Sequence, residues 1–224
     1  MLHTLGLAGD LDDVDLVQDV ERAFGLRLPD EELTRCSTVG DLFELVVRKL
    51  PDGFAAADRC ATAMCFYRVR RVILNLAPNL TVRPSTPIQA LRSISVKSLY
   101  HAIQREAGLT PPSVYLSGWG GLALILFFAL PIGLLVAGQP WWSAVLAAAL
   151  SLALYRVSPV RLPPAVATIG DLIQVITAHN VAALAAEGAR LRPDEAWRAF
   201  RTICGSHAVA EGGEIEPGTL IYAA

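Results

Sequence analysis

The longest uncharged stretch in the chain sets the strongest limit on its fold. No Asp, Glu, Lys or Arg occurs from Ala107 to Tyr155. Two apolar runs, GWGGLALILFFALPIGLLVAG at 118–138 and WWSAVLAAALSLALYRV at 141–157, flank the helix-breaking pair Gln139-Pro140. The first run is long enough to cross a hydrocarbon layer of about 30 Å, and the second lies near the lower limit. The pattern therefore predicts a transmembrane helical hairpin over 118–157.

Aromatic and basic residues at the ends of this hairpin indicate an orientation. Trp and Tyr favour the membrane interface, and Arg favours the cytoplasmic side. The predicted interface residues are Trp119, Trp141, Trp142, Tyr155 and Arg156. They predict a multi-pass protein of a bacterial-type inner (plasma) membrane, in contact with membrane lipid and with both termini in the cytoplasm. The alternative is a hairpin buried inside a water-soluble helical bundle.

Charge outside the hairpin is divided between two segments of opposite sign. The chain has 19 basic and 21 acidic residues, a net charge of −2, so no overall field favours nucleic acid as a partner. Residues 1–49 contain eleven acidic and five basic side chains, a net −6, whereas residues 50–110 contain three acidic and eight basic, a net +5. The split indicates two different surfaces, or one surface that pairs with the other.

Residues suited to catalysis or metal binding are scattered. The four histidines have no ligand spacing, and the four cysteines have no CxxC spacing. GxSxG, P-loop and GxGxxG motifs are absent from the sequence. We therefore expect reduced thiols, no metal site, no catalytic residue and no enzyme activity.

A pentapeptide occurs twice, as TVGDL at 38–42 and TIGDL at 168–172. Each copy follows an amphipathic helical pattern that ends in Gly-Leu, at Gly25 and Gly108, as C-capping glycines do. A related loop sequence also occurs twice, as VRPST and IEPGT. These markers predict a duplicated unit with the hairpin inserted in a loop of the second copy. The alternative is a pair of ordinary helix capping boxes.

Residues 14–50, VDLVQDVERAFGLRLPDEELTRCSTVGDLFELVVRKL, resemble the second half of an acyl carrier protein of the phosphopantetheine-binding family. The resemblance implies an all-α fold of two small acyl-carrier-like bundles plus the transmembrane hairpin. The first, circularly split module is 1–50 plus 190–224, and the second is 54–117 plus 158–182. The C-terminal helix completes the first module either within the chain or in a neighbouring copy.

The same resemblance implies where a phosphopantetheine arm would attach. The family's modified serine lies fifteen residues before the glycine that ends the second helix, which corresponds to Asp10 in the first module and Ser93 in the second. Aspartate lacks a hydroxyl to modify. Ser93 has one, but Arg92 and Ile94 replace the family's acidic residue and leucine. Ser93 is therefore either a helix cap or a phosphopantetheine site, the one cofactor that the resemblance suggests.

In this family an acidic helix docks on basic patches of partner enzymes. The corresponding predicted partner-binding residues here are Asp10, Asp12, Asp13, Asp15, Asp19 and Glu21. The leading hypothesis is a non-catalytic, membrane-anchored docking or scaffold protein that presents acyl-carrier-like modules to cytosolic acyl-handling or biosynthetic enzymes. The alternatives are a membrane-tethered acyl carrier with phosphopantetheine on Ser93, and a small subunit or assembly factor of a membrane complex.

Overall fold

The structure, a computed structural model, describes residues 3–7, 12–50, 58–112, 115–116, 118–157, 160–162, 166–209 and 213–222. Its α-helices are α1 (Asp12–Phe24), α2 (Asp30–Leu33), α3 (Val39–Lys49), α4 (Ala61–Leu76), α5 (Val96–Ala102), α6 (Gly118–Val136), α7 (Trp141–Val157), α8 (Ile169–Ala178), α9 (Val181–Ala186) and α10 (Pro193–His207). A 3-10 turn η1 (Ile88–Leu91) and a π-helical turn η2 (Ile103–Ala107) accompany them. The strands are β1 (Thr4–Leu7), β2 (Arg59–Cys60), β3 (Tyr115–Leu116), β4 (Val160–Arg161), β5 (Ala189–Arg190) and β6 (Leu220–Tyr222).

The chain divides into two compact units. The first unit comprises Met1–Ile94, Ser98–Pro112 and Ala167–Ala224. The second comprises Ser95–Lys97 and Ser113–Val166, and contains the helical hairpin.

One buried core of the first unit joins residues from both ends of the chain. On α1 the buried residues Leu16, Val20 and Phe24 recur every four positions, so one stripe of the helix faces inward. On α10, Phe200 is fully buried and its ring packs 5.3 Å from that of Phe43 on α3, centroid to centroid. The amphipathic pattern of these helices thus assembles residues 16–46 and 196–204 into a single core.

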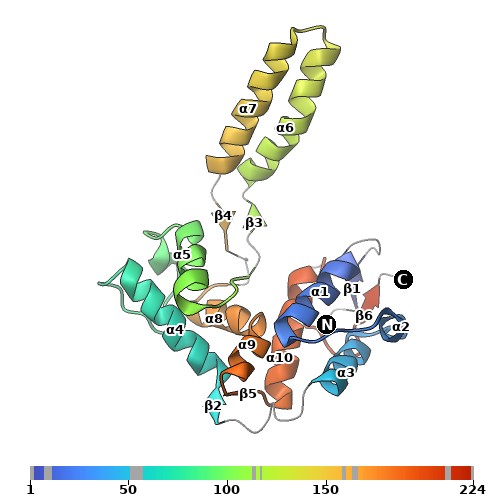
Figure 1. The fold of residues 1–224 in the computed structure, drawn as a ribbon, viewed down its shortest axis with the longest axis vertical. Coiled ribbons are helices and arrows are strands. Elements are labelled where there is room, and N and C mark those ends of the chain that lie inside the picture. The colour runs from blue at the N-terminus through green and yellow to red at the C-terminus, as the bar shows by residue number, and fades with distance from the viewer. Residues whose placement is uncertain are drawn as a thin grey trace. The chain divides into compact units, whose positions relative to one another are not determined.

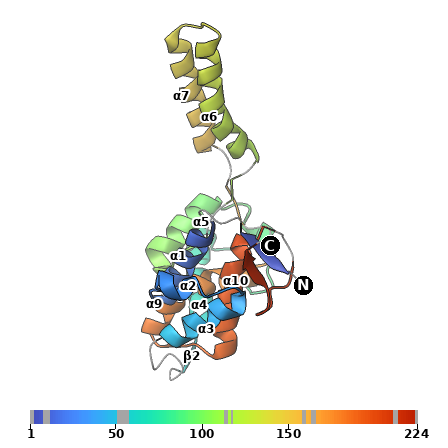
Figure 2. The same cartoon turned by 90° about the vertical axis from the view of Figure 1, so that its right-hand side faces the viewer.

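The two terminal segments meet in a short sheet (Figure 2). Strand β1 pairs in parallel with β6, and the N–H of Leu220 donates to the carbonyl of His3 at 3.0 Å. Leu5 and Leu7 of β1 and Ile221 of β6 point into the same core. Helices α1 and α10, from opposite ends of the sequence, therefore lie against each other in this structure.

The rest of the first unit is built around α8, which packs against both α4 and α10 (Figure 1). Asn180, which lies between α8 and α9 and is 4% exposed, connects this region to the chain segment before the hairpin. The N–H of Thr110 donates to Asn180 Oδ1 at 2.8 Å, and Asn180 Nδ2 donates to the carbonyl of Thr110 at 2.7 Å. The chain segments on either side of the hairpin are therefore hydrogen-bonded to each other.

In the second unit, α6 and α7 lie side by side (Figure 1). The small residues Ala123, Ala144, Ala147 and Ser151 are buried, whereas large apolar residues of both helices are exposed. At the base of the hairpin, β3 pairs antiparallel with β4, with Leu116 opposite Val160. A predicted hairpin of two helices is thus present over 118–157.

The membrane assignment of this hairpin is wrong: in the part of the chain that the structure describes, no helix combines the length and apolarity needed to cross a bilayer. Helix α7 has 17 residues, which is at the lower limit for a membrane span. The predicted multi-pass topology and inner-membrane location rested on those spans and are withdrawn with them.

The all-α prediction is also wrong, because six short strands pair in three two-stranded sheets among the described residues. These strands have two to four residues each, too few for an alternating pattern to be seen in the sequence. The fold is mostly helical. The predicted division into two modules and an insertion stays a prediction.

Candidate functional site

Both copies of the repeated pentapeptide begin a helix with the same capping box. In the first, the N–H of Asp41 donates to Thr38 Oγ1 at 3.1 Å, and the N–H of Thr38 donates to Asp41 Oδ2 at 2.9 Å. In the second, Asp171 and Thr168 make the same two hydrogen bonds at 3.2 and 2.8 Å. The threonine and the aspartate are therefore explained by the free N–H groups of a helix N-terminus.

The glycine of each pentapeptide makes room for a loop from elsewhere in the chain. The N–H of Gly40 donates to the carbonyl of Pro217 at 2.8 Å, and that of Gly170 donates to the carbonyl of Pro84 at 2.8 Å. A Cβ at Gly40 would lie 2.8 Å from the Pro217 oxygen, and one at Gly170 would lie 3.0 Å from the Pro84 oxygen. Each Pro-x-Thr loop thus closes against one pentapeptide in the same way.

We call these two contacts the loop joints: Pro217–Thr219 on Gly40, and Pro84–Thr86 on Gly170. In each loop the threonine Oγ1 accepts a hydrogen bond at 3.0 Å from an N–H three residues earlier, that of Glu216 or Arg83. The repeated pentapeptide is therefore a packing element that receives a loop, in addition to being a capping box.

The acidic residues predicted to bind a partner do not form one continuous face of α1. Asp10 lies outside the described residues, as does the side chain of Asp12. Asp15 is exposed, whereas Asp13 and Glu21 line a cleft beside the helix. The predicted docking set is therefore spread over different sides of α1.

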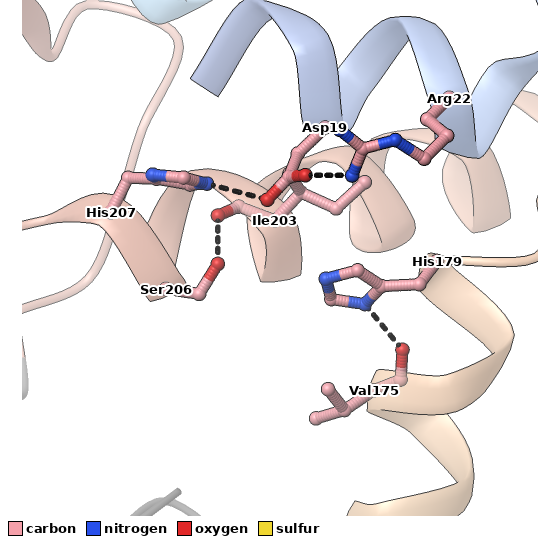
Figure 3. A network of polar contacts seen from close by, with 7 residues as sticks. All are labelled: Asp19, Arg22, Val175, His179, Ile203, Ser206 and His207. Carbon is pink, nitrogen blue, oxygen red and sulfur yellow. Dashed lines mark hydrogen bonds and ion pairs between the residues drawn. The ribbon is translucent and has the colours of Figure 1, made fainter. Parts of the chain in front are cut away.

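Asp19 faces α10 and belongs to a polar network within the unit (Figure 3). Its carboxylate accepts a hydrogen bond from Arg22 Nη1 at 2.5 Å and contacts His207 Nε2 at 3.0 Å. His207 lies in the last turn of α10, so this contact ties α1 to α10. Asp19 thus has a structural role in addition to its predicted role in docking.

The cleft lies between α1 and the segment Arg27–Cys36, which contains α2, and has a volume of about 530 Å³. Glu21 holds this segment in place, since the N–H of Leu28 donates to its Oε1 at 2.7 Å and Arg27 pairs with its Oε2 at 3.2 Å. At the other end, the hydroxyl of Tyr222 donates to Asp13 at 3.2 Å. Strand β6 thus also contributes to the wall of the cleft.

Ser93 lies in a turn between η1 and α5, and its side chain is exposed. Helix α5 begins at Val96, so Ser95 and not Ser93 occupies the position directly before it. The residue directly before it, Arg92, is basic and exposed. Ser93 therefore presents an accessible hydroxyl without the acidic helix of a conventional carrier.

Cys36, Cys65 and Cys204 lack the features of activated nucleophiles. Burial raises the pKa of Cys65 to about 11 and that of Cys204 to about 12, so both are neutral thiols at physiological pH. The half-buried Cys36 lines the cleft, and burial raises the pKa of its thiol as well. Within the described residues, no group of three His, Cys, Asp or Glu side chains is arranged as metal ligands.

The residues predicted to lie at a membrane interface are found on the hairpin helices. Trp141 and Trp142 are exposed in the first turn of α7, and Tyr155 and Arg156 are exposed in its last turn. Trp119 lies on α6, but its side chain is outside the described part of the structure.

The chain is similar in part to an acyl carrier protein of Thermotoga maritima. The two are 46% identical over 50 residues, which make up 22% of this chain and 60% of that protein. This chain therefore spans less than two thirds of its relative's length. No family model matches the chain, and no solved structure matches it. The chain thus contains a region that resembles a carrier protein rather than an enzyme.

Sequence reasoning found the acidic helix and the capping boxes but missed the cleft and the loop joints. The cleft depends on Glu21 holding Leu28 and on Tyr222 reaching Asp13, contacts that span up to 209 positions. The loop joints did leave a signal in the sequence, because there are two related loop sequences, VRPST and IEPGT, and two pentapeptides for them to contact.

Proposed function

We propose that this protein is a non-catalytic docking protein that presents an acyl-carrier-like surface to an acyl-handling or biosynthetic enzyme. The observation that carries the proposal is the partial similarity to an acyl carrier protein combined with a folded acidic helix, α1. In the sequence before this helix, Asp10 occupies the position of the family's modified serine. Such a helix can attract a basic enzyme surface although its module has no hydroxyl to load.

Charge steering supports this role for the N-terminal segment. Its net charge of −6 comes from eleven acidic and five basic side chains in residues 1–49. Asp15 on α1 and Glu31 on α2 are exposed, so part of this charge is directed to solvent. A dense charge of one sign raises the rate of encounter with a surface of the opposite sign and makes binding dependent on salt.

Co-purification of the tagged full-length chain, followed by mass spectrometry, tests the proposal. We expect a stoichiometric acyl-handling or biosynthetic enzyme that is released by salt and is lost with Asp15→Lys. Glu44→Lys, which makes the same change in charge at an exposed acidic residue of α3, serves as the control and should retain the enzyme. Retention of the enzyme by both variants, or the absence of any such enzyme, would contradict the proposal.

The exposure of Ser93 supports a second candidate function, that of a genuine acyl carrier. Intact-mass measurement after incubation with a phosphopantetheinyl transferase and coenzyme A separates the two functions. A carrier gains the mass of one phosphopantetheine in the wild type and in Ser95→Ala, and gains none in Ser93→Ala. A docking protein gains none in any of the three.

A further inference from the structure

The cleft beside α1 has an apolar floor. Val14 and Val17 of α1 and Leu33 of α2 line it, and Val14 is 44% exposed although α1 buries its other stripe in the core. The volume, about 530 Å³, is in the range of sites that bind a small molecule or a few inserted side chains. A recess of this size with an apolar floor can bury an apolar side chain of a partner.

The rim of the cleft is acidic. Among the described residues, Asp13, Glu21 and Asp30 line it together with one basic residue, Arg27, whose side chain pairs with Glu21. The next exposed residue of α2 is also acidic, Glu31. An occupant that carries a carboxylate, such as a free fatty acid, would meet like charges at this rim, whereas a cationic occupant would meet opposite ones.

We propose that the cleft receives a basic amphipathic segment of the partner protein, with an apolar side chain on Val14, Val17 and Leu33 and Lys or Arg side chains on the acidic rim. This inference rests on the proposed docking function and adds a contact site for the same partner to the exposed acidic residues of α1 and α2. Apolar anchors in a pocket supply most of the affinity of an interface, while rim charges supply steering and orientation.

Cys36 provides a local reporter for the occupied cleft. Its thiol lines the cleft, is half-buried and lies 3.6 Å from the carbonyl of Glu32. Cys60 is exposed and is not among the residues that line the cleft. Alkylation of the intact protein by N-ethylmaleimide, mapped by mass spectrometry, therefore compares a thiol inside the proposed site with one outside it.

The probe is a synthetic amphipathic helical peptide of Leu and Lys, whose binding to the full-length protein is measured by fluorescence anisotropy. A Leu and Glu peptide of the same pattern tests the charge, a Ser and Lys peptide tests the apolar contact, and lauric acid tests the fatty-acid alternative. We expect the Leu and Lys peptide alone to bind and to slow alkylation of Cys36 without affecting Cys60.

Two matched pairs of variants locate the binding. Val14→Lys in the cleft is compared with Val47→Lys on α3, where the wild-type side chains are 44% and 45% exposed. Asp30→Lys in the first turn of α2 is compared with Asp194→Lys in the first turn of α10. Since each pair changes the net charge equally, non-specific attraction is lowered equally. We expect the two cleft variants to lose at least about tenfold in affinity and the controls to change by less than about twofold.

Equal losses in both members of a pair, unprotected Cys36, or preferential binding of lauric acid would overturn the inference. The same variants separate it from the proposed function. An enzyme partner that is captured equally by wild type, Val14→Lys and Val47→Lys leaves the docking function in place and rejects the cleft. Peptide binding that follows the expected pattern, without any captured acyl-handling or biosynthetic enzyme, supports the cleft and rejects the proposed function.

Discussion

Gly25 and Gly108 have the same backbone conformation in different surroundings. Both have φ near +64°, the left-handed region that favours glycine at a helix C-terminus. A Cβ at Gly25 would lie 2.7 Å from the Cβ of Ala182 on α9, whereas a Cβ at Gly108 would meet nothing within 4 Å. The first glycine is therefore required for conformation and for close packing, and the second for conformation alone.

Alanine at these two positions should separate the two effects. Gly108→Ala should lower the free energy of unfolding by about 1–2 kcal/mol through the left-handed backbone. Gly25→Ala should lower it by about 1–3 kcal/mol more, since α1 and α9 must move apart. Chemical denaturation followed by circular dichroism measures both. Equal losses would show that the contact between Gly25 and Ala182 is not tight.

Asp41 makes the stability of the N-terminus of α3 depend on pH. Hydrogen bonds from Thr38, backbone first, and from the backbone of Ser37 hold the pKa of the Asp41 carboxyl below its ordinary value of 3.8. Because the folded-state pKa is the lower one, the ionised carboxylate stabilises the fold above pH 3.8, and this stabilisation is lost as the pH falls through 3.8 and below.

Asp41→Asn should remove that pH dependence while keeping the shape of the side chain. At neutral pH we expect the variant to be less stable than the wild type by about 0.3–1 kcal/mol, because an anion at a helix N-terminus is replaced by a neutral group. The difference should shrink as the pH is lowered below 3.8. Denaturation midpoints of both proteins across this range provide the measurement, and a difference that is constant with pH would contradict the assignment.

At the scale of elements, Asn180 joins α8 and α9 to the segment before the hairpin. Its amide also donates to the carbonyl of Ile176 at 2.7 Å, in addition to its two hydrogen bonds with Thr110. One buried side chain thus satisfies backbone groups on segments 70 positions apart in the sequence.

Asn180→Ala should destabilise the protein by about 1–3 kcal/mol, since it leaves buried backbone groups without their partners. Asn75→Ala is the control, because Asn75 is exposed and donates to the exposed Glu106, and should cost less than about 1 kcal/mol. Amide exchange at Thr110 reports on the junction itself. Faster exchange in Asn180→Ala alone is expected, and unchanged exchange there would show that Asn180 does not hold the junction.

Elements with strong periodicity or capping chemistry could be predicted from the sequence. The amphipathic helix that ends at Gly25 occurs as predicted, with Leu16, Val20 and Phe24 in the core. The box of Thr38 and Asp41, the alternative interpretation of the pentapeptide, is also a local pattern and is present. The pairing of β1 with β6 and the cleft depend on contacts between chain ends, which a local pattern does not specify. Hydropathy predicted the two hairpin helices near their actual bounds, but the membrane assignment was wrong, since no described helix combines the length and apolarity needed to cross a bilayer.

At the scale of the molecule, the first unit is assembled from segments that are far apart in the chain. Pro217 closes on Gly40, and Pro84 closes on Gly170. Thr110 and Asn180 lie on opposite sides of the hairpin and are still hydrogen-bonded. From these contacts we predict that the hairpin is an insertion and that the first unit folds without it.

Excision of the hairpin tests this central claim most directly. Because Leu116 lies opposite Val160, an Asn-Gly turn in place of residues 117–159 can join β3 to β4. The decisive measurement is amide hydrogen exchange at Gly40, Thr110 and Gly170 in the excised protein. We expect protection equal to that in the full-length chain at all three amides, and exchange at unfolded-chain rates would show that the first unit needs the hairpin in order to fold.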